Sequence, residues 1–84
     1  MTVEAYFVYV LQNREGRLYI GQTWNIEKRL TEHNVRGKGY TSKFRPWQLV
    51  YTERFVFREE ALQIERYLKT AVGREWLKKN LKGA

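Results

Sequence analysis

The N-terminal part of the chain carries two short apolar runs separated by a turn signal. Residues 5–12 are rich in aromatic and β-branched side chains, and both alternate faces of the run are largely apolar, which predicts a central strand covered on both sides. Asn13 and Gly16 then favour a turn, because both residue types accept backbone conformations that other residues avoid. Residues 17–22 are therefore expected to return as the second strand of a hairpin.

A helix is predicted directly after the hairpin, over residues 26–34. Thr23 or Asn25 can cap it, because either side-chain oxygen can accept a free backbone N–H of the first turn. Ile26 and Leu30 lie one turn apart and are its expected core contacts.

The second half of the chain alternates loop, strand and helix patterns. Residues 35–44 contain two glycines and several cations without helical periodicity, so we expect a loop. Residues 47–55 are predicted to form a third strand, and residues 58–70 a helix. The apolar stripe of that helix consists of Ala61, Ile64, Leu68 and Ala71. Gly73 is expected to end it, before a last short basic helix over residues 74–82.

These elements predict an α+β fold, a small antiparallel sheet of about three strands with helices packed on its faces. We expect one domain over residues 1–84, with its core at about 5–70. Strict alternation places Leu49 and Tyr51 on the same face of the third strand.

Charge and composition narrow the classes of partner. Sixteen Lys and Arg against nine Asp and Glu give a net charge of +7, which favours a polyanionic partner such as nucleic acid. Without cysteine and with one histidine, disulfides and the usual zinc sites are excluded, so carboxylates and a hard cation such as Mg²⁺ remain. No apolar run reaches the roughly 20 residues of a membrane span. The N-terminus also lacks a signal-peptide pattern, so a cytoplasmic protein is expected.

Glu65 is the most informative residue of the second half. It lies four residues after Ala61 and three before Leu68, within the stripe that should be buried. A carboxylate there is costly unless it is paired or bound to a cation. Two interpretations stay open: a buried ion pair with Arg29 or another cation, and a metal ligand on the floor of a site.

Four residues of the first half have ordinary interpretations when each is taken alone. Arg29 and His33 lie one turn apart at the border of an apolar stripe, where a solvated arginine and a helix-end histidine are common. Tyr9 and Tyr19 are ordinarily core aromatic residues whose hydroxyl reaches water.

Taken in order, the same positions resemble the GIY-YIG nuclease family. The first signature triplet falls on residues 7–9 and matches only at its tyrosine, whereas the second falls on residues 19–21 and matches in full. The family's arginine falls on Arg29. His33 falls one helical turn later, at the position where family members carry His or Tyr. The family's metal-binding glutamate falls on Glu65.

The similarity runs from about residue 6 to residue 68 and looks closest to small stand-alone bacterial GIY-YIG proteins. Residues 40–43 and 45–47 also look like that group's loop. There are two departures: Phe and Val replace Gly and Ile at residues 7–8, and Gln22 stands where some members carry lysine.

The resemblance implies a metal-dependent endonuclease that hydrolyses phosphodiester bonds in DNA with one Mg²⁺ or Mn²⁺ ion. Tyr9 would be the general base, and nearby cations would lower its pKa from about 10. Tyr19 would position the attacking water, and Arg29 would hold the scissile phosphate. His33 would hydrogen-bond a tyrosine or the phosphate, and Glu65 would hold the metal.

A basic loop would complete the nucleic-acid contact. Its cations would grip flanking phosphates without reading bases. They are Arg36, Lys38, Lys43 and Arg45.

A shared site imposes a condition on the hairpin. Tyr9 and Tyr19 must lie on one face of the sheet, and a one-residue slip would move every side chain to the other face. We therefore predict an odd-length connection or a bulge around residues 13–17.

Two other functions compete with the nuclease. One is a non-catalytic nucleic-acid-binding module that retains the fold, favoured by the missing cation at Gln22. A pure binder has no need to bury Glu65, which counts against it. The other is a protein-interaction domain that uses Trp47 and Trp76 as an exposed patch.

Overall fold

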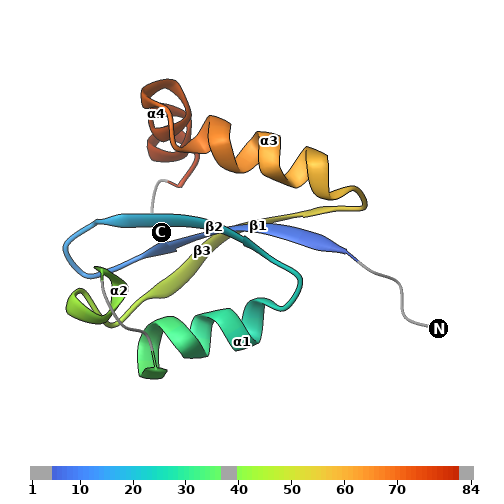
Figure 1. Cartoon of the computed structure of the whole chain (residues 1–84). Coiled ribbons are helices and arrows are strands. Elements are labelled where there is room, and N and C mark those ends of the chain that lie inside the picture. Colours follow the sequence, from blue (N-terminus) through green and yellow to red (C-terminus); the bar gives the residue numbers. More distant parts are fainter. Residues whose placement is uncertain (1–4, 37–39, 82–84) are drawn as a thin grey trace.

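The computed structural model describes residues 5–36 and 40–81; for residues 36, 40 and 41 it describes the backbone only. Within these ranges, three strands, four α-helices and one π-helical turn follow one another (Figure 1). The elements are β1 (Tyr6–Gln12), β2 (Leu18–Thr23), α1 (Ile26–Thr31), α2 (Tyr40–Lys43), β3 (Gln48–Phe55), α3 (Arg58–Leu68) and α4 (Ala71–Asn80), with a π-helical turn at Glu32–Arg36 after α1.

The strands form one antiparallel sheet with β1 in the centre, in the order β2-β1-β3. Figure 1 shows α1 on one face of this sheet and α3 with α4 on the other. The predicted α+β fold and the central position of the first strand are therefore confirmed. None of the helices in the described ranges is long and apolar enough to cross a bilayer.

The hairpin connection between β1 and β2 is an ordered turn over residues 13–17. The Asn13 side-chain oxygen accepts hydrogen bonds from the backbone N–H groups of Glu15 at 3.1 Å and Arg17 at 2.8 Å. Gly16 has a φ of +85°, which L side chains rarely adopt. The predicted turn residues thus act as expected.

This connection has an odd number of residues and sets the register of the hairpin. Tyr9 pairs with Gly21, and Leu11 pairs with Tyr19. Because Tyr9 and Leu11 share a face, the two tyrosines project from the same side of the sheet. The prediction of an odd-length connection is confirmed.

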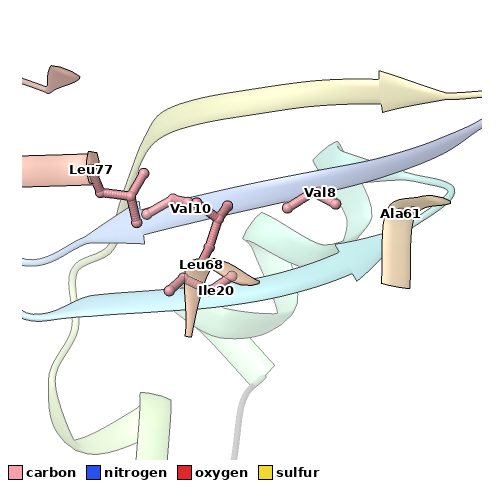
Figure 2. Packing of buried hydrophobic residues seen from close by; sticks show 6 residues of the cluster. All are labelled: Val8, Val10, Ile20, Ala61, Leu68 and Leu77. Atoms are coloured by element: carbon pink, nitrogen blue, oxygen red, sulfur yellow. The ribbon is translucent and has the colours of Figure 1, made fainter. Parts of the chain in front are cut away.

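Both faces of the sheet are buried, each by its own cluster. Figure 2 shows the cluster beneath α3 and α4, which consists of Val8, Val10, Ile20, Ala61, Leu68 and Leu77. The cluster toward α1 consists of Tyr9, Leu11 and Trp47, with Tyr19, Leu30, Phe44 and Leu49 packed against it. The second cluster has a polar rim, and the candidate site lies there.

The third strand does not follow the predicted alternation. Val10 pairs with Tyr51, but Leu11 pairs with Leu49, because the register shifts between Val10 and Leu11. Such a bulge places one extra residue in β3. Leu49 therefore packs toward α1 and Tyr51 toward α3, contrary to the shared face that strict alternation predicted.

Two helix predictions also need correction. The predicted loop over residues 35–44 contains α2, a single helical turn that periodicity could not reveal. The predicted helix break at Gly73 is wrong, because Gly73 lies inside α4. The Thr70 hydroxyl caps α4 by accepting a hydrogen bond from the Gly73 N–H at 3.1 Å. A side chain at Gly73 would overlap the Tyr67 carbonyl, so this glycine permits the close approach of α3 and α4.

Candidate active site

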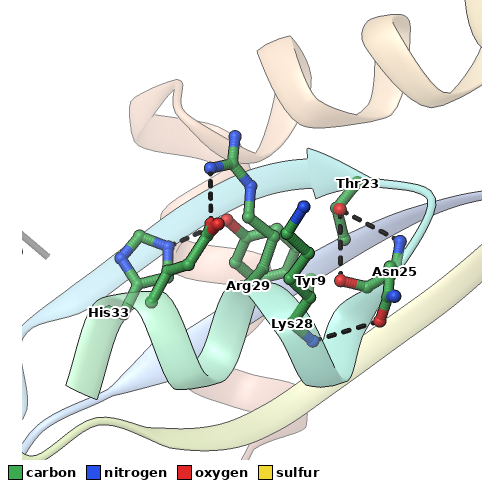
Figure 3. A network of polar contacts seen from close by, with 7 residues as sticks. Tyr9, Thr23, Asn25, Lys28, Arg29 and His33 are labelled. Atoms are coloured by element: carbon green, nitrogen blue, oxygen red, sulfur yellow. Dashed lines mark hydrogen bonds and ion pairs between the residues drawn. The ribbon is translucent and has the colours of Figure 1, made fainter. Parts of the chain in front are cut away.

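A buried hydrogen bond between Tyr9 and His33 forms the centre of the site. Tyr9 comes from the central strand and is 2% exposed, and His33 comes from the π-helical turn and is 8% exposed. The Tyr9 Oη lies 3.1 Å from the His33 Nε2 (Figure 3). π-Helical turns are rare and are frequently found at functional sites.

Tyr19 packs beside this pair. Its ring centroid lies 4.6 Å from that of His33 and 6.3 Å from that of Tyr9. The buried Trp47 packs edge-on against the Tyr19 ring, with the two ring centroids 6.3 Å apart. The structure thus brings two phenols and one imidazole into a single aromatic cluster.

The segment around Trp47 is tied to the turn that carries His33. The Asn34 side chain accepts from the Trp47 backbone N–H at 2.6 Å and donates to its carbonyl at 3.0 Å. The Arg45 Nε donates to the His33 carbonyl at 2.8 Å. These contacts fix the backbone of the turn that carries His33.

The cations predicted to contact phosphate differ in exposure, and two of their side chains are not described. Arg45 is half-buried and bonded to the backbone, and Lys43 is exposed. Lys38 and the side chain of Arg36 lie outside the described residues. Contacts of this loop with phosphate therefore stay a prediction.

Burial governs the ionisation of the central pair. Burial raises the pKa of Tyr9 well above its usual value, the neighbouring Tyr19 adds to this effect, and Arg29 opposes it. Burial and then the charge of Arg29 lower the pKa of His33. At neutral pH, a protonated Tyr9 hydroxyl therefore shares this hydrogen bond with a neutral imidazole. Arg29 lowers the Tyr9 pKa as expected, but desolvation outweighs it, so the expected net fall of this pKa is wrong for the free protein.

This ionisation predicts a loss of stability in alkali. A tyrosine whose folded pKa is raised contributes stability that is fully present below the unfolded pKa of 10.0 and is lost as the pH rises through the folded pKa. Burial also raises the pKa of Tyr51, to about 12. The free energy of unfolding should fall by up to about 1.4 kcal/mol per pH unit for each of these tyrosines above pH 10.

Urea denaturation at several pH values above neutrality measures this slope. Tyr9→Phe should remove the Tyr9 contribution and leave that of Tyr51. An identical alkaline slope in wild type and Tyr9→Phe would show that the Tyr9 hydroxyl is not desolvated.

Arg29 and Glu65 form local ion pairs instead of one with each other. The Arg29 Nη1 lies 3.1 Å from the Glu32 Oε1, and this hydrogen bond raises the pKa of Arg29 (Figure 3). The Lys69 Nζ lies 2.9 Å from the Glu65 Oε2. Of the open alternatives, the ion pair of Glu65 is therefore made with another cation, Lys69, and not with Arg29.

Glu65 remains largely covered even so. Its side chain is 19% exposed, although Lys69 beside it is 50% exposed. Its negative charge contributes to the raised pKa of Tyr9, after burial and Tyr19. Glu65 follows Arg58 by two helical turns, so the two residues share one side of α3.

An open pocket of about 260 Å³ lies next to Arg29. It combines residues of β2 and α1 with the first residue of α3, so it spans the edge of the sheet. Its lining residues are Tyr6, Gln22, Thr23, Trp24, Asn25, Lys28, Arg29, Glu32 and Arg58.

Gly21, the last residue of the second signature triplet, makes room for the Tyr9 ring. A Cβ built at Gly21 would lie 2.6 Å from the Tyr9 Oη. We expect Gly21→Ala to destabilise the fold by about 1–3 kcal/mol, as overpacking does, and to displace the hydroxyl from His33.

Chemical denaturation of a double-mutant cycle tests this contact. In a Tyr9→Leu background, the added methyl at Gly21 should cost less than in wild type, because the ring that it meets is gone. Additive effects would contradict the proposed clash.

Several residues of the site were not singled out from the sequence. Asn34 is one of them, and the pair His33-Asn34 at a helix end was an available signal. Gly21 was part of the matched second triplet, but its close approach to the Tyr9 ring was not predicted. Lys28 and Arg58 were not among the predicted site residues. Both enter the pocket through the arrangement of α1 and α3 around the sheet edge, which no local pattern encodes.

The described residues fit a divalent metal only if the substrate and water supply most of its ligands. Within residues 5–36 and 40–81, no three His, Cys, Asp or Glu side chains gather in a cluster. Glu65 offers one largely buried carboxylate. Mg²⁺ is commonly bound by one or two carboxylates, with substrate phosphates and water as the other ligands. Glu65 therefore fits a metal whose coordination the substrate completes.

Comparisons with known proteins agree with this geometry. The family model described as the GIY-YIG catalytic domain matches residues 5–80. A UPF0213 protein of Bacillus licheniformis is 48% identical over 70 residues, covering 82% of this chain and 72% of that protein. A UPF0213 protein of Staphylococcus saprophyticus is 41% identical over 69 residues, covering 81% of this chain and 84% of that protein.

A solved structure extends the match to three dimensions. The solution NMR structure of a UPF0213 protein from Bacillus halodurans has a TM-score of 0.57 and 32% sequence identity. The match covers 95% of this chain and 87% of that one. The chain therefore belongs to the GIY-YIG family, together with the UPF0213 proteins.

Proposed function

We propose that this chain is a metal-dependent endonuclease that hydrolyses phosphodiester bonds in DNA. Membership of the GIY-YIG family points to nuclease chemistry on nucleic acid. The observation that carries the proposal is the buried Tyr9–His33 hydrogen bond, beside Tyr19 and near a half-exposed arginine. Such a pair supplies proton-transfer groups that phosphodiester hydrolysis needs and that binding alone does not use.

The Tyr9–His33 pair can accept the proton of an attacking water. Burial keeps His33 neutral and Tyr9 protonated near neutral pH. As water attacks phosphorus, its proton passes to the Tyr9 oxygen while the Tyr9 proton passes along the 3.1 Å hydrogen bond to His33 Nε2. This transfer avoids a free phenolate, which the surroundings disfavour.

Arg29 is proposed to hold the scissile phosphate. Its guanidinium is half exposed at the pocket, and its planar set of donors matches two phosphate oxygens. Lys28 and Arg58 add positive charge to the same pocket. Tyr19, which packs against His33, is proposed to orient the attacking water.

Glu65 is proposed to hold Mg²⁺ or Mn²⁺ at the leaving side of the phosphate. When bound, such an ion offsets the negative charge that develops on the leaving oxygen. Lys69 now neutralises this carboxylate at 2.9 Å. The Lys69 side chain is half exposed and can turn toward solvent at little cost, because such ion pairs contribute about 0–1 kcal/mol.

The same ion pair favours a second candidate function. A module that binds nucleic acid without cleaving it would leave Glu65 permanently paired with Lys69. The basic side chains of the pocket would serve such a module equally well.

Nicking of supercoiled plasmid separates the two functions. The endonuclease should convert the plasmid to its open circular form with Mg²⁺ or Mn²⁺, and EDTA should abolish the conversion. Salt-sensitive DNA binding without nicking in either metal would reject the endonuclease and support the binding module.

A further inference from the structure

The rim of the Arg29 pocket carries an exposed tryptophan. Trp24 is 69% exposed, more than any other large hydrophobic side chain in the described residues. A lone exposed hydrophobic residue needs no explanation by itself. Trp24, however, lines the same pocket as Arg29, to which the scissile phosphate is assigned.

The backbone holds Trp24 in a fixed position. The Thr23 hydroxyl accepts a hydrogen bond from the Asn25 N–H at 3.1 Å and donates to the Asn25 carbonyl at 3.3 Å, so it brackets Trp24 (Figure 3). Asn25 in turn caps α1 by accepting from the Lys28 N–H at 3.0 Å. The backbone at Trp24 is therefore held in a pre-organised turn at the rim of the pocket, which lowers the entropy cost of binding there.

The surroundings of Trp24 favour a nucleotide over an apolar protein surface. Three cations, Lys28, Arg29 and Arg58, line the pocket with one carboxylate, that of Glu32. Gln22 also lines this pocket, and its buried Nε2 has no hydrogen-bond partner among the described residues. A ligand that fits this pocket carries negatively charged oxygens for the cations and, next to them, a flat ring that can stack on the indole. A nucleotide has both, in its phosphate and its base.

We propose that Trp24 stacks on an unpaired nucleobase next to the phosphate held by Arg29. The inference rests on the proposed function for the role of Arg29. A base within continuous duplex has both faces covered by its neighbours and must first be unstacked. The substrate class is therefore DNA with unpaired nucleotides at the cleavage position, such as single strands or flaps.

Fluorescence anisotropy in EDTA, where no hydrolysis occurs, measures the stacking directly. The probes are a short labelled oligothymidylate, an abasic chain with the same phosphates, and a blunt duplex. Trp24→Ala should weaken binding of the oligothymidylate by about tenfold, as expected for loss of one base–aromatic stack. Binding of the abasic chain and the duplex should not change.

Two variants control for general effects. Trp24→Phe should retain most of the affinity, because a smaller ring still stacks. Trp76→Ala removes an indole that is 38% exposed on α4, away from the pocket, and should bind all probes as wild type does. Unfolding curves of each variant exclude loss of fold as the cause.

The outcomes separate this inference from the proposed function. Unchanged binding of oligothymidylate by Trp24→Ala, or equal weakening for the abasic chain, would overturn the stacking role and leave an interaction with another protein. Trp24-dependent binding without any nicking by wild type would retain the inference and reject the nuclease. If wild type nicks DNA and Trp24→Ala changes the binding of no DNA probe, the nuclease is retained and the stacking role is rejected.

Discussion

Tyr9→Phe is expected to lower the rate of plasmid nicking by about 10²–10⁴-fold, the usual contribution of a general base. The substitution removes only the hydroxyl that lies 3.1 Å from His33 and keeps the buried ring. The unpaired imidazole should cost about 1 kcal/mol of stability. The rate is measured under single turnover, and stability by thermal unfolding.

Tyr51→Phe is the matched control for this variant. Tyr51 also loses a hydrogen-bonded hydroxyl, which donates to the Glu53 carboxylate at 2.8 Å, but its ring packs toward α3. Its nicking rate should equal that of wild type. Equal nicking by Tyr9→Phe and Tyr51→Phe would remove Tyr9 from the mechanism.

Glu65→Gln is expected to lower nicking by about 10³-fold in Mg²⁺, because a bound metal supplies several kcal/mol of transition-state stabilisation. The amide keeps the shape of the side chain and loses the charge that a hard cation needs. The ion pair with the half-exposed Lys69 is also lost, at a cost of about 0–1 kcal/mol. Nicking rates across a Mg²⁺ titration measure the effect.

Glu75→Gln serves as the control for loss of a helical ion pair. Glu75 lies 4.0 Å from Lys78 on α4 and is 65% exposed. Its metal dependence should match that of wild type. If Glu65→Gln nicked DNA with wild-type rate and Mg²⁺ dependence, the carboxylate would be only a partner of Lys69.

Much of the fold was predictable because local patterns and topology agreed. The apolar faces of the first strand predicted its central position, and the requirement that Tyr9 and Tyr19 share a face predicted the odd-length turn. Asn25 caps α1, as one of the two predicted candidates. The bulge beside Leu49 was not predictable, because it depends on pairing with another strand.

The candidate site was less predictable than the fold. Spacing placed His33 one turn after Arg29, but the bond from His33 to Tyr9 depends on a π-helical turn that widens the helix there. The direction of the Tyr9 pKa was mispredicted because burial is a tertiary property. The partner of Glu65 was left open, and it is Lys69, one helical turn further along the chain.

The turn over residues 13–17 has a consequence for any variant of this chain. Adding or deleting a single residue there inverts the parity of the hairpin, so Tyr19 would exchange sides with its strand neighbours. Changes by two residues keep both phenols beside the imidazole. Functional length variants of this loop should therefore differ from one another in steps of two.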